Sequence, residues 1–252
     1  MIALLLLIPI FFCLGSFLNC MAYRLVHLQH PRTSRSCCPV CKQIIAWYDL
    51  IPVISWIFLR ARCRRCAAPI SFLYPLIELL TVIIFLGLIY KIPMEYLFGY
   101  GIFFAALIIS IRTDLETMLI SRFVTLCLIP IGFMLSLLGL LPIHFSQALL
   151  GTIFGYFILW GIAKMFYLLT GKHGMGEGDY DLLAFIGSFT GVVGVWLSLL
   201  LGSVVGSIVG ILLIAWSGKK QMTQPIPFGP FLAGGAILYV LFQTQITSFL
   251  LY

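Results

Sequence analysis

Long apolar runs alternate with short polar stretches along most of the chain. The runs cover residues 2–21, 72–90, 96–111, 123–141, 148–169, 182–216 and 231–252. Several of them reach the roughly 20 residues that a helix needs to cross a bilayer. Inside a bilayer every backbone polar group must be bonded internally, and the sequence does not show the alternation of barrel strands. The pattern therefore predicts an all-α polytopic membrane protein.

The number of spans depends on the run at residues 182–216, which is too long for one ordinary transmembrane helix. We predict two helices there, joined by a tight turn near Leu201–Ser203, for a total of about eight transmembrane helices. The expected organisation is a first transmembrane helix at residues 1–22, a cytosolic segment at residues 23–71, and a seven-helix membrane domain at residues 72–252.

Composition and charge agree with a membrane protein. The chain of 252 residues is 62% hydrophobic and 9% charged, with a net charge of +7, whereas a soluble domain has roughly 25% charged residues. If residues 23–71 are cytosolic, the outer connections hold one basic residue, Lys91, and the inner side holds the other fourteen, including Lys219 and Lys220. This pattern predicts a multi-pass membrane protein with its basic segments in the cytosol and explains the positive charge without nucleic acid.

The first apolar run is expected to remain in the protein as a transmembrane helix. The first apolar run has no basic region before it and no small-residue cleavage site after it. Both features favour a transmembrane helix over a signal peptide.

Four cysteines in the basic segment have the spacing of a metal site. Cys38 and Cys41 form one C-x-x-C pair, and Cys63 and Cys66 form another. Paired knuckles of this kind favour a structural Zn²⁺ with four thiolate ligands. The reducing cytosol makes disulfides the weaker alternative. Cys37 adjoins the first pair, but only Cys38 keeps the two-residue spacing.

Two aspartates lie at the polar ends of apolar runs. Asp114 follows one run, and Asp179 ends the glycine-rich stretch at residues 174–179. The predicted topology places both at the cytosolic face. Two carboxylates within hydrogen-bond reach share a proton, so that one acts as an acid and the other as a base. Such a pair suits peptide hydrolysis, whereas in the alternative interpretation each aspartate only caps a helix.

Taken in order, these residues resemble the bacterial prepilin peptidases, aspartyl proteases of the GxGD type. The matching stretches are residues 15–19, 38–41, 47–56, 62–66, 74–78, 114, 174–179, 182–184 and 226–231. The resemblance implies that the protein lies in the bacterial cytoplasmic membrane, and that Asp114 and Asp179 cleave a basic leader from type IV prepilins and pseudopilins at its cytosolic face. It also implies methylation of the new N-terminus with S-adenosylmethionine, for which the residues themselves give no independent support.

Two positions depart from the family pattern. After the first aspartate the family commonly has a Leu/Ile-Pro-Asp/Asn element, and this chain has Ile120-Ser121-Arg122. Two positions after the second aspartate the family often has a lysine, and this chain has Asp181. Both catalytic candidates remain in place. We hypothesise that the added acid at position 181 helps to attract a basic leader.

Two functions of other classes fit parts of the sequence. An ion-coupled transporter would use Glu78, which lies inside a predicted span and should face the bundle interior. The absence of paired interrupted helices in the two halves argues against it. A zinc-organised membrane scaffold would bind a cytosolic partner through residues 23–71. In the leading interpretation the partners are prepilin-like precursors and the lipid bilayer.

Overall fold

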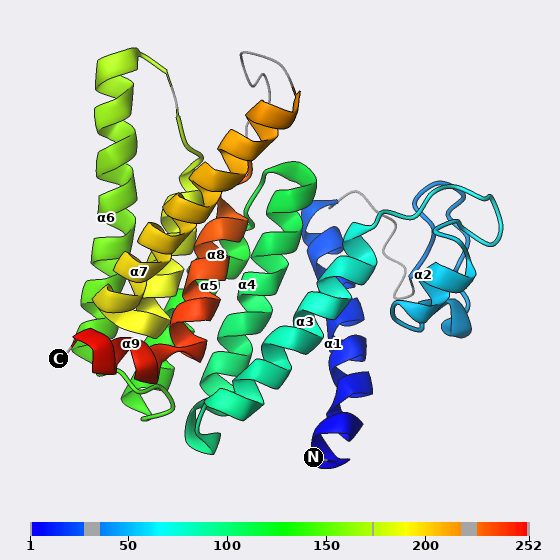
Figure 1. Ribbon diagram of the computed structural model, residues 1–252, viewed down its shortest axis with the longest axis horizontal. Helices are drawn as coiled ribbons and strands as arrows, with labels where there is room; N and C mark the ends of the chain where they lie inside the picture. Colours follow the sequence, from blue (N-terminus) through cyan, green and yellow to red (C-terminus); the bar gives the residue numbers. More distant parts are fainter. Residues whose placement is uncertain (1, 28–35, 173, 218–225, 251–252) are drawn as a thin grey trace. The chain divides into compact units, whose positions relative to one another are not determined.

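The fold is that of a computed structural model, which describes residues 2–27, 36–172, 174–217 and 226–250 (Figure 1). Within these ranges all regular structure is helical, apart from two isolated β-bridges. The long apolar helices are α1 (Ile2–Val26), α3 (Leu73–Lys91), α4 (Leu97–Thr117), α6 (Phe145–Thr170) and α7 (Glu177–Ser217). The shorter elements are η1 (Trp47–Leu50), α2 (Ile54–Phe58), η2 (Met94–Tyr96), α5 (Arg122–Leu137), α8 (Gly229–Leu241) and α9 (Gln243–Leu250).

The described residues contain five helices that are long and apolar enough to cross a membrane. The all-α membrane fold predicted from the sequence is thereby confirmed. Helices α5 and α8 are apolar but have only 16 and 13 residues, so the expected count of eight spans is not confirmed. The last apolar run is divided between α8 and α9, and Lys219 and Lys220 lie outside the described residues.

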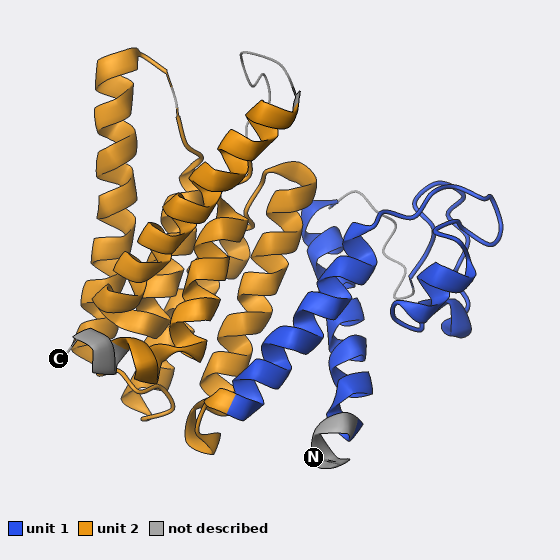
Figure 2. Cartoon of the chain, in the orientation of Figure 1, with its two compact units in different colours: residues 1–90 blue, residues 91–252 orange. Residues whose placement is uncertain are grey.

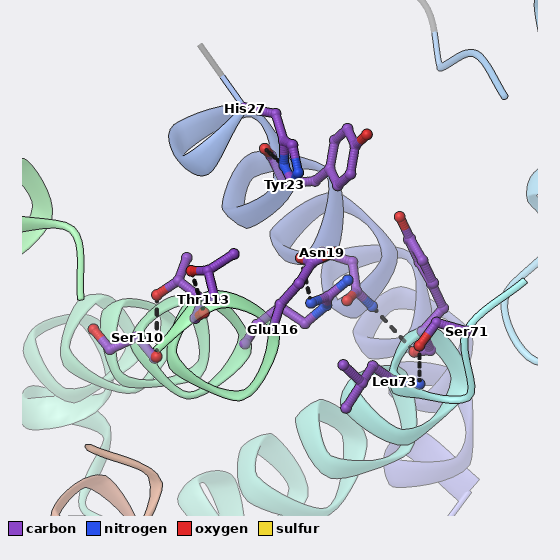
Figure 3. Close-up of polar contacts among 11 residues, drawn as sticks. Asn19, Tyr23, His27, Ser71, Leu73, Ser110, Thr113 and Glu116 are labelled. Carbon is purple, nitrogen blue, oxygen red and sulfur yellow. Dashed lines mark hydrogen bonds and ion pairs between the residues drawn. The ribbon is translucent and has the colours of Figure 1, made fainter. Parts of the chain in front are cut away.

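The chain forms two compact units, an N-terminal unit of residues 1–90 and a C-terminal unit of residues 91–252 (Figure 2). In the N-terminal unit, α1 and α3 approach closely at Gly15, where an added Cβ would lie 2.9 Å from the Cα of Glu78. The Asn19 amide donates a hydrogen bond to the Tyr74 carbonyl oxygen at 3.1 Å. At the start of α3 the Leu73 N–H donates to the hydroxyl of Ser71 (Figure 3).

Helix α7 of the C-terminal unit contains a break at Gly191, whose φ of 69° and ψ of −171° are not helical. Only glycine adopts this combination without strain. The part of α7 before the break packs against α6, and an added Cβ at Gly155 would lie 2.5 Å from the Leu183 carbonyl oxygen. The part after it packs against α8, where an added Cβ at Gly235 would lie 2.7 Å from the Ser198 carbonyl oxygen.

The two parts of α7 run in opposite directions. Gly194, just after the break, lies against Tyr239 near the end of α8, whereas Gly210 lies against Ile226, which precedes α8. The prediction of two helices in this run is therefore supported, but the predicted turn near Leu201–Ser203 is wrong, because those residues are helical. Gly202 serves for close packing instead: an added Cβ there would lie 3.1 Å from the Phe231 carbonyl oxygen.

Candidate active site and metal centre

Asp114 lies in the last turn of α4 and is buried. The helix ends just after it, where Met118 adopts a left-handed conformation and donates its N–H to the Asp114 carbonyl oxygen at 2.9 Å. The carboxylate oxygen Oδ2 accepts a hydrogen bond of 2.9 Å from the N–H of Gly229. Gly229 is the first residue of α8, and the N-terminus of a helix favours a negative charge. The start of α8 therefore stabilises the ionised form of Asp114.

Asp179 lies in the first turn of α7 and is also buried. Its N–H donates a hydrogen bond to the Gly176 carbonyl oxygen at 3.2 Å. The first turn of α7 therefore begins within the glycine-rich stretch. Gly178, which precedes Asp179, and Gly229, which bonds Asp114, both lie against Ile120, so the two aspartates belong to one region of the structure. Because α7 begins at Glu177, Asp179 is not the N-cap residue that the alternative interpretation required. Asp114, by contrast, does bond the first N–H of a helix, although that helix is α8.

Ile120 fills the space between the segments that carry the two aspartates. An added Cβ at Gly229 would lie 2.7 Å from Asp114 Oδ2 and 3.0 Å from Ile120 Cδ1. An added Cβ at Gly178 would lie 3.0 Å from Ile120 Cβ. The end of α4, the start of α7 and the start of α8 thus meet around one side chain. The two glycines leave room for this close approach.

Arg122, the first residue of α5, forms ion pairs with the start of α7. Its Nε donates to Asp181 Oδ2 at 2.7 Å, and its Nη1 lies 3.4 Å from Glu177 Oε2. The Asp181 side chain is only 3% exposed. Its charge is therefore balanced inside the protein, and the hypothesis that Asp181 attracts a basic leader loses its basis.

Glu78 of α3 is buried in the N-terminal unit, as expected for an acid inside a span. Its Oε2 accepts a hydrogen bond of 2.8 Å from the N–H of Val53. Val53 has a φ of 59°, which is rare for a β-branched residue. Glu78 thus anchors the strained turn that precedes α2. An acid with this structural partner gives the transporter interpretation no support.

The four predicted metal ligands converge in the N-terminal unit. The Sγ atoms of Cys38, Cys41, Cys63 and Cys66 all lie within 4.8 Å of one another. The Sγ atoms of Cys38 and Cys66 are 3.8 Å apart. Sulfur ligands at about 2.3 Å from a tetrahedral zinc would be about 3.8 Å apart. The Cys38–Cys66 spacing thus matches a tetrahedral zinc site, and the other two thiols lie close enough to complete it. Cys37 stands outside this cluster.

Each cysteine pair sits on a turn of the same design. In the first, the Lys42 N–H donates to the Cys38 carbonyl oxygen at 2.9 Å; in the second, Ala67 donates to Cys63 at 2.9 Å. Lys42 and Ala67 both have positive φ, 58° and 56°. Isolated bridges close the two turns, from Cys37 to Ile44 and from Arg62 to Pro69. The segment is thus an internal repeat with an offset of 25 residues, which the sequence analysis did not identify.

The backbone of the second turn prepares one thiol for metal binding. Hydrogen bonds from the backbone of Cys66, and then of Arg65, lower the pKa of the Cys63 thiol to about 7. Thiolates are the metal-binding form of cysteine. A thiol that ionises near neutral pH is suited to be the first ligand to engage a metal ion.

The site includes groups that the sequence analysis did not identify. The Gly229 N–H lies in the matched stretch at residues 226–231, but nothing in that stretch pointed to a bond with Asp114. Arg122 and Asp181 were noted only as separate departures from the family pattern. The opposite charges of Arg122 and Asp181 were the one feature of the sequence that could have indicated an ion pair between them.

Comparison with known proteins gives one consistent result. Residues 10–92 match the bacterial peptidase A24 N-terminal domain, and residues 101–211 match the type IV leader peptidase family. A prepilin leader peptidase/N-methyltransferase of Aeromonas hydrophila is 40% identical over 222 residues, which are 86% of this chain and 74% of the relative. A protein of the same name from Stutzerimonas stutzeri is 35% identical over 217 residues, 84% of this chain and 73% of the relative. No solved structure matches the chain.

Proposed function

Because this chain belongs to the type IV leader peptidase family, we propose that it cleaves the basic leader from prepilin-like precursors. The reaction would take place at the cytosolic face of the cytoplasmic membrane, within the membrane domain at residues 72–252. The observation that supports the proposal is that the segments carrying Asp114 and Asp179 meet, together with the start of α8, around Ile120. The apolar helix of a precursor would lie in the bilayer, with its basic leader in the cytosol.

We assign different roles to the two carboxylates. Asp114 is the base, because the Gly229 N–H stabilises its ionised form. Asp179 holds the proton, because two neighbouring carboxylates do not both ionise readily. Asp114 takes a proton from water as the water oxygen attacks the scissile carbonyl carbon. Asp179 protonates the carbonyl oxygen, and collapse of the tetrahedral intermediate passes a proton to the leaving nitrogen.

Replacement of each aspartate by asparagine tests the dyad, because it keeps the side-chain size and removes acid–base function. We expect Asp114→Asn and Asp179→Asn to lower cleavage of a prepilin-type substrate by at least about 10³-fold, in line with general acid–base catalysis. Purified protein in detergent or liposomes is the material to assay. Glu95→Gln is the matched control, since Glu95 is an exposed acid in η2. Cleavage retained in either aspartate variant would contradict the assignment.

We propose methylation of the newly formed N-terminus as a second activity, with S-adenosylmethionine as the methyl donor. The support is the name shared by the relatives, which includes N-methyltransferase. Transfer of a labelled methyl group to a precleaved substrate measures this activity separately from proteolysis. We expect Asp179→Asn to retain it, because the precleaved substrate bypasses the peptidase. No transfer by the wild-type protein would remove this activity from the proposal.

We propose that the cysteine cluster binds a structural zinc ion. The ligands would be Cys38, Cys41, Cys63 and Cys66, whose sulfur atoms lie within 4.8 Å of one another. Four protein ligands leave no open coordination position, so the metal would stabilise the segment at residues 23–71 and take no part in hydrolysis. Elemental analysis should give about one zinc per chain, and a content near zero would contradict this assignment.

A further inference from the structure

Arg122 holds the first turn of α7 at two points. Glu177 and Asp181 are one helical turn apart and so lie on the same face of α7. Arg122 reaches both, with 2.7 Å to Asp181 and 3.4 Å to Glu177. Asp179 lies between these two residues in the same turn. The position of Asp179 is therefore tied to the position of one guanidinium group.

The segment that carries Arg122 is itself tied to Asp114. Only four residues, 118–121, separate the end of α4 from Arg122. Within this short connection Ile120 packs against the positions of Gly178 and Gly229. A shift of Arg122 relative to α7 would therefore change the separation between Asp114 and Asp179.

We propose that Arg122 and Asp181 form a clamp that sets the distance between the two catalytic carboxylates. The inference rests on the proposed peptidase function and adds positioning residues to it. Neither clamp residue takes part in proton transfer. Arg122 acts through α7, and Asp181 is the buried anchor on that helix.

The burial of Asp181 explains why the clamp is more than a surface ion pair. Exposed ion pairs contribute little, but a buried carboxylate that loses its cation is strongly unfavourable. Without Arg122, the start of α7 would have to move to bring Asp181 toward water. Such a movement would displace Asp179, which is two residues away. A displacement of about 1 Å in an active site can lower the rate about a hundredfold.

The departures from the family pattern agree with the clamp. Arg122 stands where the family commonly has Asp or Asn, and Asp181 stands where it often has lysine. The structure shows that these two positions are the two partners of one ion pair. Relative to a pattern with Asp at the first position and lysine at the second, the charges of the pair are exchanged.

Exchange of the charges provides the test. The variants are Arg122→Glu, Asp181→Lys and the double variant with both changes, all made in a Glu177→Gln background so that no second acid faces position 122. Each is assayed for cleavage of a prepilin-type substrate and compared with Glu177→Gln alone. Each single variant places two like charges at the contact, and the double variant restores an opposite pair. We expect kcat to fall about tenfold to a hundredfold in each single variant. KM should change by no more than about twofold, and the double variant should recover most of kcat.

Two further variants separate positioning from folding. Arg122→Lys keeps the charge and should retain more of kcat than Arg122→Gln, although both lose the planar guanidinium. Lys164→Glu is the control for charge reversal, since Lys164 is an exposed cation of α6 in the same unit. Single variants with wild-type kcat, or a double variant no more active than the singles, would overturn the clamp. A wild-type protein that does not cleave would instead overturn the proposed function.

Discussion

At the scale of single residues, the site depends on a backbone group as much as on its two acids. The Gly229 N–H bonds Asp114 Oδ2, and the absence of a side chain at Gly229 makes this contact possible. This bond fixes the direction of one carboxylate oxygen, and in the proposed mechanism the other oxygen faces the attacking water. The orientation of the proposed base, Asp114, would therefore be set by a residue that takes no part in the chemistry.

Gly229→Ala tests this dependence. The new Cβ would lie 2.7 Å from Asp114 Oδ2, so the carboxylate or the start of α8 must shift. We expect kcat for leader cleavage to fall roughly tenfold to a hundredfold, as for other small displacements of catalytic groups. Gly234→Ala in the same helix is the matched control, because its Cβ would meet nothing within 4 Å. Equal activity of the two variants would show that the Gly229 contact is unimportant.

The sequence predicted the acids and thiols of the candidate sites but not their supporting contacts. Asp114 and Asp179 were found because carboxylates at the edge of apolar runs are unusual, and the cysteines were found because their spacing is regular. The bond from Gly229 joins residues 115 positions apart, and a backbone donor leaves no signal in the sequence. The pair of Arg122 and Asp181 required the packing of α5 against α7.

At the scale of secondary-structure elements, glycines have two separate uses in α7. Gly191 breaks the helix and reverses its direction. Gly202 and Gly206 remain helical and face Phe231 of α8. The presence of glycine alone could not distinguish these uses, because glycine is favoured both at a break within a helix and at a close contact between two helices. This is why the sequence analysis predicted the division of the run correctly and placed the turn about ten residues too late.

Gly191→Ala should destabilise the C-terminal unit. An added Cβ would find ordinary spacing, with its nearest neighbour at 3.6 Å, so the cost comes from the backbone conformation. For a non-glycine residue this region of φ and ψ costs of order 1–3 kcal/mol. Thermal unfolding in detergent should show a lower midpoint for this variant. Gly161→Ala is the control, because Gly161 is helical and its Cβ would meet nothing within 4 Å; an equal midpoint for both variants would contradict the strained break.

At the scale of the whole molecule, the two candidate sites belong to different units. The cysteine cluster lies within residues 1–90, and both aspartates lie within residues 91–252. The two family matches, to residues 10–92 and 101–211, fall on either side of nearly the same boundary. The cysteine segment has little apolar core, so a metal ion would supply much of its stability. The C-terminal unit has buried aromatic packing of its own, with Phe103 stacked on Phe189 at 4.9 Å.

Loss of the metal should therefore unfold one part of the chain and leave the other folded. We expect Cys63→Ser to lower the zinc content and to make residues 36–70 sensitive to added protease, while the helices of residues 91–252 stay protected. Cys37→Ser is the matched control, because this neighbouring thiol stands outside the cluster. Zinc analysis of both variants, combined with mass spectrometry of the protease fragments, measures the two effects together. Equal zinc loss in both variants would reject the assigned ligand set, and protease cleavage that spread into residues 91–252 would reject the independence of the C-terminal unit.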